Sequence, residues 1–211
     1  MTDTAPADPQ LIAAWLAARS VARALPAPVA DRGGWRVDTG GPVEIVRWVF
    51  PAPVDGLAEL AREITAPGRF IKLLAGEAAL AALVPDRWQV QPPAWFMTTT
   101  AAPAHATLPA GYTIVEHRSG GRTHVRILGP DGDAAASGYA AETAAAFVYD
   151  RIRTEPAHRR RGLGRALIAT LGRARVGDVP QLLTATPDGR ALYRQLGWSE
   201  LSSYSTVTIP A

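Results

Sequence analysis

The segment around residue 160 constrains this chain more than any other. An apolar run at residues 144–152 is followed, after a short connection, by Arg159-Arg160-Arg161-Gly162-Leu163-Gly164-Arg165, which opens an amphipathic helix. The first backbone N–H groups of a helix have no partner within it and lie at the positive end of its dipole. Gly162 and Gly164 let the backbone approach a bound group and turn successive N–H groups inward. The segment therefore predicts a site for a phosphate-bearing ligand.

The spacing of the glycines excludes two common phosphate loops. A dinucleotide fingerprint needs a third small residue where Leu167 stands, and a nucleoside-triphosphate loop needs Gly-Lys-Ser/Thr after a longer gap. The remaining pattern, R-x-x-G-x-G over residues 159–164, resembles the pyrophosphate-binding motif of the GNAT superfamily of acetyl-CoA-dependent N-acetyltransferases. The resemblance implies an α/β (α+β) fold, with a mixed, mostly antiparallel sheet whose central strands splay apart and are flanked by helices.

The resemblance continues on both sides of the loop. In the superfamily, the strand before the loop pairs with the pantetheine arm of the cofactor, and residues 147–154 match that strand. Residues 187–198 resemble the second signature, a helix ending in Leu-Tyr-x-x-x-Gly-aromatic whose tyrosine points at the cofactor sulfur. Thr186 stands where the family often has an asparagine. The implied acetyl-CoA contacts are Ile152, Arg153, Thr154, Arg159, Arg160, Arg161, Gly162, Leu163, Gly164, Arg165, Thr186 and Tyr193.

Each of these features also has a simpler interpretation. Three consecutive arginines are typical of a solvated basic turn or a nucleic-acid patch. Gly162 and Gly164 alone fit an ordinary tight turn, and Tyr193 alone fits a core residue with its hydroxyl at the rim. The two signatures occur in the expected order and at a suitable separation, and this joint occurrence favours the cofactor site.

Composition sets wider limits on function. The 211 residues include 47% hydrophobic residues, enough for a substantial core, and carry a formal charge of only +3. Lys72 is the only lysine, and no interleaved basic and aromatic face predicts nucleic-acid binding. The absence of cysteine excludes disulfides and thiolate metal sites, and we expect no metal. Because the sequence shows neither a leader peptide nor a membrane span, we expect a soluble cytoplasmic protein without membrane contact.

The remaining elements predict two parts. Asp8-Pro9 predicts a helix start, and strands are expected near residues 35–37, 43–50 and 70–74, with helices from Asp55 and around Leu80. Pro92-Pro93 argue against a central strand at residues 88–97. Residues 98–109 form the expected linker. We therefore predict an N-terminal α/β lobe at residues 1–108, which contributes to the acceptor site, and an acetyl-CoA-binding core at residues 109–211.

The first half is either a lobe that covers the acceptor side or a degenerate copy of the acetyltransferase fold, without its phosphate loop. The core opens with a meander of strands near residues 112–117, 123–128 and 135–141, and the helix after the loop is expected to stop near Gly177.

Acyl transfer to an amine requires a proton acceptor, donors for the developing oxyanion and a proton for the departing thiolate. Tyr193 is the candidate donor to the thiolate, and the backbone near residues 152–154 supplies the oxyanion donors. Asp150 is the candidate base, because it lies in an otherwise apolar strand; an ion pair with Arg151 or Arg126 is the equal alternative. Glu142 is the reserve base, and a water-relayed path needs no side chain.

The acceptor does not follow from the sequence. The resemblance implies transfer to a primary amine of a small molecule by direct attack in a ternary complex. Aminoglycosides, including kasugamycin-type substrates and hence antibiotic resistance, are a family-level option. A protein or peptide amine, or a non-catalytic CoA-binding sensor, are the alternatives. The oligomeric state, with a homodimer among the options, also stays open.

Overall fold

The computed structural model describes residues 7–102 and 105–210. The first half of the chain alternates helices and strands: α1 (Pro9–Arg23), β1 (Val29–Asp31), β2 (Gly34–Asp38), β3 (Val46–Phe50), α2 (Asp55–Glu63), β4 (Arg69–Leu73), α3 (Glu77–Ala81), β5 (Gln89–Val90) and β6 (Ala94–Thr99). The second half contains β7 (Thr113–Ser119), β8 (Arg122–Leu128), β9 (Ala134–Glu142), β10 (Phe147–Thr154), a 3-10 turn (Pro156–His158), α4 (Leu163–Gly172), β11 (Gln181–Ala185), α5 (Pro187–Gln195) and β12 (Ser199–Thr208).

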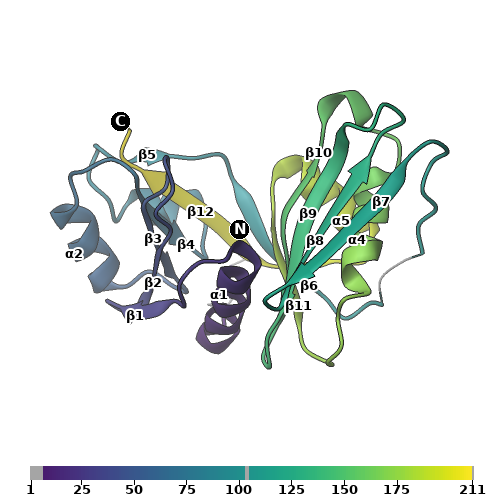
Figure 1. Cartoon of the computed structure of the whole chain (residues 1–211). Helices are drawn as coiled ribbons and strands as arrows, with labels where there is room; N and C mark the ends of the chain where they lie inside the picture. The colour runs from purple at the N-terminus through teal and green to yellow at the C-terminus, as the bar shows by residue number, and fades with distance from the viewer. Residues whose placement is uncertain (1–6, 103–104, 211) are drawn as a thin grey trace.

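All strands belong to one mixed, mostly antiparallel sheet. Its order is β1-β2-β3-β4-β12-β6-β11-β10-β9-β8-β7, and β5 pairs with β12 at the side. The sheet forms two lobes, with β1 to β5 in the first and β7 to β11 in the second, and α1 lies at their junction (Figure 1). The predicted fold class, including the flanking helices, is confirmed.

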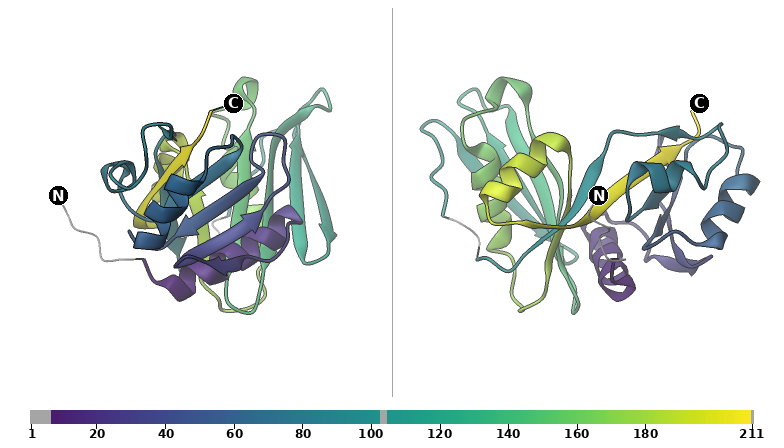
Figure 2. Two further views of the ribbon diagram at one scale, coloured as in Figure 1. Left: turned by 90° about the vertical axis from the view of Figure 1, so that its left-hand side faces the viewer. Right: turned by 180° about the vertical axis from the view of Figure 1, so that it is seen from behind.

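Two strands connect the lobes. β6 comes from the first half of the chain yet lies between β11 and β12, where it pairs antiparallel with both. β12 begins beside β6 and continues into the first lobe, where it pairs with β4 and β5; Figure 2 shows this crossing from behind. Strand pairing therefore crosses the predicted division at residue 108.

The expectation that Pro92-Pro93 exclude a central strand was wrong. The two prolines lie between β5 and β6, and β6 begins at Ala94, immediately after them. Proline removes a ladder donor only at its own position, so the following residues are free to pair on both sides. The strand also continues to Thr99, so the first residues of the expected linker belong to the sheet.

Most other predicted elements are present with bounds shifted by a few residues; the strand expected at 43–50, for example, begins at Val46. Asp8 caps α1, its carboxylate accepting a hydrogen bond from the Gln10 N–H, and Pro9 follows in the first turn. The meander of β7, β8 and β9 and the strand β10 lie where the sequence predicts them. The helix after the glycine loop was predicted too long, since α4 ends at Gly172 instead of near Gly177. The carboxylate of Glu142 accepts the N–H groups of Val176 and Gly177 and holds that connection.

Helices cover the sheet on both faces. α4 and α5 pack on one face of the second lobe through apolar residues that include Leu163, Leu167 and Leu171. α1 packs on the opposite face through Ile12, Trp15 and Leu16, and the same apolar cluster reaches first-lobe residues. α2 and α3 cover the outer face of β3, β4 and β12. Among the described helices, only α1 therefore covers the inner face of the first lobe, because α2 and α3 lie on its outer face.

Candidate functional site

The strands β10 and β11 run parallel and separate soon after they begin. They pair only at Phe147 with Gln181 and at Val148 with Leu182. On its other side, β10 shifts register against β9 between Asp150 and Arg153, and Arg151 has a φ of 52°. Such a bulge turns a strand away from its neighbour. The edge of β10 beyond Val148 is consequently open on the β11 side, as the resemblance to the GNAT superfamily implied.

The loop that follows β10 presents backbone donors. Arg160 and Gly162 have φ values of 62° and 78°, and Gly162 is the N-cap of α4 without any side-chain cap. Within the part of the chain that the structure describes, the N–H groups of residues 160–165 donate to no protein acceptor. A Cβ built on Gly162 would meet nothing within 4 Å. The start of α4 is therefore an open, unsatisfied anion site.

Exposed cations surround this helix start. Arg160 and Arg161 are exposed, and Arg159 reaches back so that its Nε lies 3.5 Å from the carbonyl oxygen of Thr154. Arg153 is also exposed, but it forms an ion pair with Glu155 at 3.0 Å. Most of the predicted loop contacts thus lie together at the end of β10, with the backbone as the inner layer and guanidinium groups outside.

The second signature lies beside the first. A Cβ on Gly164 would come within 2.9 Å of Leu192 Cδ2, so α4 and α5 are in close contact at this glycine. Thr186 caps α5, its hydroxyl oxygen accepting the Gly189 N–H at 3.3 Å. Tyr193 is only 5% exposed and packs against Trp198, with 5.8 Å between the centroids of the two rings. Burial raises the pKa of Tyr193, and the nearby charge of Asp150 adds to the effect, so the phenol stays protonated at neutral pH.

Asp150 is held in a buried ion-pair group. Its Oδ1 lies 3.1 Å from Nε of Arg19 and 2.9 Å from Nη2 of Arg23, and its Oδ2 lies 2.6 Å from Nε of Arg23. Burial opposes ionisation, but the two arginines outweigh it and lower the pKa of Asp150 to about 2. Such a carboxylate is a very weak base. The contacts favour the ion-pair alternative, with partners on α1 instead of the predicted Arg151 or Arg126.

Glu142, the reserve base, lies elsewhere. Its two carboxylate oxygens accept backbone N–H groups of the connection after α4, at 2.6 and 2.7 Å. This is a capping role at the far end of the helix from the glycine loop. The structure thus places Glu142 away from the glycine loop, in contacts that do not favour its reserve role as a base.

Comparison with known proteins agrees with this geometry. The acetyltransferase (GNAT) domain family matches residues 115–200, which include β10, the loop, α4 and α5. The chain contains a GNAT domain. No curated protein sequence matches the chain. The GNAT domain and the shared fold support an acyltransferase.

Three solved structures share the fold of the GNAT domain and the lobe beside it. A GCN5-related N-acetyltransferase from Kribbella flavida is 16% identical, with a TM-score of 0.66 over 98% of this chain and 97% of that one. A functionally unknown conserved protein from Staphylococcus epidermidis is 8% identical, with a TM-score of 0.60 over 86% and 92%. A putative GNAT-family acetyltransferase from Novosphingobium aromaticivorans is 18% identical, with a TM-score of 0.53 over 86% and 89%. At these identities the likeness establishes the fold.

Sequence reasoning missed the charged residues that face the GNAT domain from the first half. Arg19 and Arg23 stand four residues apart in an otherwise apolar helix face, and Lys72 is the only lysine and lies within an apolar strand. A cation at a position that the pattern predicts to be buried was the available signal.

Within residues 7–102 and 105–210, no helix is long and apolar enough to span a bilayer.

Proposed function

We propose that this protein transfers an acetyl group from acetyl-CoA to a primary amine of a small molecule, by direct attack within a ternary complex. The observation that carries the proposal is the run of unsatisfied backbone N–H groups at residues 160–165, beside the separating strands β10 and β11. The fold alone implies acyl transfer; the residue roles and the acceptor class are our proposal.

The residues present fit acetyl-CoA. The helix start offers donors and the positive end of a dipole to a diphosphate, and exposed Arg160 and Arg161 add charge-assisted contacts. The open edge of β10 offers backbone groups to the amides of the pantetheine arm, as an added strand would. When bound, acetyl-CoA supplies an acyl group activated as a thioester. Ile152 and Thr154 belong to the strand segment that we propose to line this arm.

Protein groups then act at two places. Backbone N–H groups of β10 near Ile152 stabilise the negative charge that develops on the acyl oxygen. Tyr193, kept protonated by its burial, donates a proton or a hydrogen bond to the departing thiolate. Since Asp150 is tied to Arg19 and Arg23, we propose that the amine loses its proton to water and that Asp150 positions α1. Holding amine and thioester together supplies much of the remaining rate increase.

The Tyr193→Phe variant tests this function. We expect CoA binding, measured by calorimetry, to stay within about twofold, while thiol release with an active amine falls by about 100-fold or more, the usual contribution of a proton donor. Tyr112→Phe is the matched control, because Tyr112 is also buried but its hydroxyl bonds Nδ1 of His158 at 2.9 Å. Its turnover should remain close to that of the wild type.

The acceptor screen decides between enzyme and sensor. Thermal shifts with acetyl-CoA present, measured against small amines, amino sugars, polyamines and peptides, identify an acceptor by its added stabilisation. Turnover with a small amine supports the proposal. Tight CoA binding without turnover for any amine would instead indicate a CoA-binding sensor, and turnover confined to peptides would indicate a protein acceptor.

A further inference from the structure

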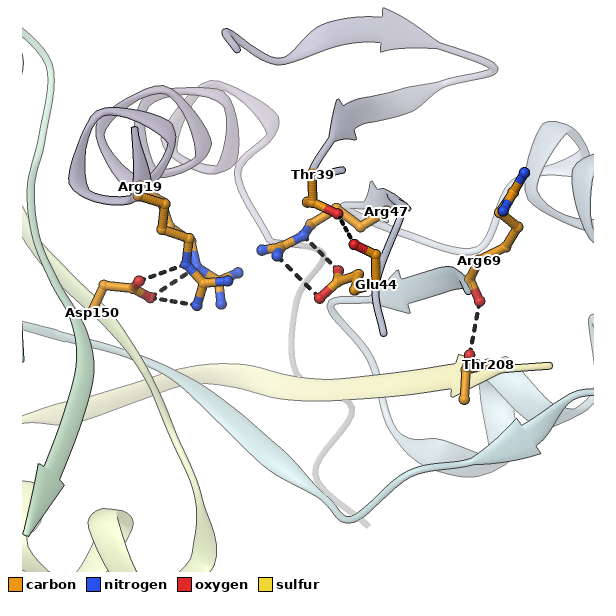
Figure 3. Close-up of polar contacts among 8 residues, drawn as sticks. Arg19, Thr39, Glu44, Arg47, Arg69, Asp150 and Thr208 are labelled. Carbon is orange, nitrogen blue, oxygen red and sulfur yellow. Dashed lines mark hydrogen bonds and ion pairs between the residues drawn. The ribbon is translucent and has the colours of Figure 1, made fainter. Parts of the chain in front are cut away.

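Charged side chains from both lobes meet on the face that looks toward α1. We call this group the junction cluster; it consists of Arg19 and Arg23 on α1, Glu44 before β3, Arg47 on β3, Lys72 on β4 and Asp150 on β10. Figure 3 shows Arg47 between the Arg19–Asp150 pair and the strands of the first lobe. The cluster lies outside the predicted CoA loop. Asp150, which we propose to position α1, is its only member with a role in the proposed acetyl transfer.

The strand pattern brings the cluster together. Lys72 pairs with Val49 on one side and with Thr206 on the other. Because side chains alternate along a strand, Arg47, Lys72 and Tyr204 therefore share the face opposite α2. The Lys72 ammonium lies 5.2 Å from the ring centroid of Phe70 and 5.8 Å from that of Tyr204. Arg47 and Lys72 thus give the first lobe a cationic face on the side that α1 approaches.

The cluster contains more positive than negative charge. Asp150 is matched by both Arg19 and Arg23, and Glu44 is matched by Arg47, whose Nη2 lies 3.1 Å from its Oε2. Lys72 has no carboxylate within ion-pair distance among the described residues. With Lys72 protonated, four cations face two carboxylates. Uncompensated charge away from water is costly, so this arrangement favours an added anion.

The pKa values of the cluster reflect this excess. Burial, reinforced by the neighbouring arginines and opposed by Glu44, lowers the pKa of Lys72 to about 7. Burial and the charge of Arg19 lower the pKa of Arg47 to about 10. Both shifts mean that the site resists its own positive charge. An anion placed among these groups would reverse them.

Unused donors point into the same region. Nη1 of Arg19 and the hydroxyl of Tyr204 are buried and make no hydrogen bond of good geometry among the described residues, although the two side chains are close enough to influence each other's pKa. Arg19 is 8% exposed and Tyr204 is 4% exposed, so bulk water does not readily satisfy these groups. Nε of Arg47 lies 2.6 Å from Oε1 of Glu44, but the angle is too oblique for a hydrogen bond. The Glu44 side chain, at 23% exposure, is the more exposed partner of this pair, and that of Arg47 is only 4% exposed.

We propose that the junction cluster binds a carboxylate carried by the acceptor, so that the acceptor is an amino acid or a similar amine with an acidic group. Arg47, Lys72, the free Nη1 of Arg19 and the Tyr204 hydroxyl are the donors. This inference rests on the proposed function, because it names the acceptor of the same transfer. Asp150 links the two sites: it holds Arg19 and stands on β10 immediately before the bulge that we assign to the acyl oxygen.

The same charges disfavour a polycationic acceptor. An aminoglycoside would bring several ammonium groups to a cluster whose two carboxylates are already paired with arginine. Like charges at close range repel, and a site of this kind selects against such ligands. We therefore place an acidic amine above an amino sugar as the acceptor.

The acceptor assay compares each amino acid with its amide. We expect the wild type to use the free acid with a KM about tenfold or more below that of the amide, as for a charged hydrogen bond. Arg47→Gln and Lys72→Met should each remove this preference by raising the KM of the acid toward that of the amide. Arg62→Gln, an exposed arginine on α2, is the matched control and should keep the preference. Equal KM values for acid and amide in the wild type would overturn the proposal.

A binding measurement without acetyl-CoA separates this inference from the proposed function. Succinate should stabilise the wild type and the Arg62→Gln variant in thermal shifts, but not the Arg47→Gln and Lys72→Met variants; inorganic phosphate is tested in parallel. If no amine is ever acetylated while succinate still binds, the proposed function fails and the anion site stands. If amines are acetylated while succinate has no effect on any variant, the anion site fails alone. Stabilisation by phosphate but not succinate would also overturn the carboxylate assignment.

Proton uptake gives a second readout. A bound carboxylate should raise the pKa of Lys72, so the protein should take up part of a proton near pH 8, measured by calorimetry in buffers of different ionisation enthalpy. The charged groups that face Lys72 are Glu44, Arg47, Arg19 and Arg23, with Tyr204 beside it. Uptake should disappear in Lys72→Met. Uptake of equal size in that variant would contradict the role of Lys72.

Discussion

Two strand–helix–strand units of this molecule share a topology and differ in their loops. In one, β3 and β4 run parallel and pair at five positions, from Val46 with Arg69 to Phe50 with Leu73. In the other, β10 and β11 pair at two positions and then separate. The first unit is consequently a closed sheet, whereas the second leaves a strand edge available for a ligand.

The starts of α2 and α4 also differ, since one is covered and the other is open. A Cβ on Gly56, in the first turn of α2, would lie 2.3 Å from the carbonyl oxygen of Arg32, so the backbone of the β1–β2 turn covers that helix start. The loop before it contains Pro51 and Pro53, which have no N–H to offer. Gly162 faces open space instead. A parallel strand–helix–strand unit is therefore an anion site only when pairing is interrupted and the helix start is left open.

The charge that each unit turns toward α1 also differs, since β10 presents Asp150 and β3 presents Arg47. Replacing Asp150→Asn leaves buried Arg19 and Arg23 without their carboxylate, and we expect a loss of about 3–5 kcal/mol in the free energy of unfolding, measured with urea. Asp38→Asn is the control, because Asp38 pairs with Arg36 at the surface, and it should change stability by less than about 1 kcal/mol. Similar losses in both variants would contradict the buried role of Asp150.

Filling the open helix start should remove cofactor binding. Gly162→Val places a branched side chain at a φ of 78°, beside the donors of residues 160–165, and we expect CoA affinity to fall by about 30- to 100-fold, or about 2–3 kcal/mol. Gly132→Val is the matched control, because Gly132 has a φ of 84° and also faces open space, in the turn between β8 and β9. Both variants should lose similar stability. Unchanged affinity in Gly162→Val would remove the basis of the comparison.

Acid should weaken the β10 side of the junction. The pKa of Asp150 is lowered to about 2 in the folded protein and is about 3.9 in an unfolded chain, so its contribution is present above pH 4 and is lost as the pH falls toward 2. The contribution is about 2 kcal/mol. The difference in unfolding free energy between wild type and Asp150→Asn should therefore narrow over this range. A constant difference from pH 5 to pH 2 would show that the carboxylate titrates normally.

The smallest effect is expected at the outer arginines. Arg161→Gln removes one exposed charge near the loop but leaves the backbone donors, so CoA affinity should fall by about two- to fivefold at low salt and by less at high salt. Arg62→Gln, on the helix of the closed unit, should have no effect. A loss as large as that of Gly162→Val would assign the binding to side chains instead of the backbone.

The sequence predicted the second unit well because its signals are local. The glycine spacing, the bounds of β10 and the start of α5 after Thr186 all depend on neighbours in the chain. It failed where distant segments decide. Pro92-Pro93 concealed β6, whose partners β11 and β12 lie far along the chain, and Asp150 found its partners on α1 instead of its own strand. Pairing between distant segments leaves no periodic pattern in one sequence.

The long-range pairing of β6 and β12 affects when the sheet can form during synthesis. β6 is synthesised long before its two partners, β11 and β12. It therefore lacks a neighbour on one or both sides until β12 has been made. The C-terminal region cannot fold as an independent unit, and a nascent chain halted before Ser199 lacks β12, one of the two strands that connect the lobes. Completion of the sheet is therefore expected only after β12 has been synthesised.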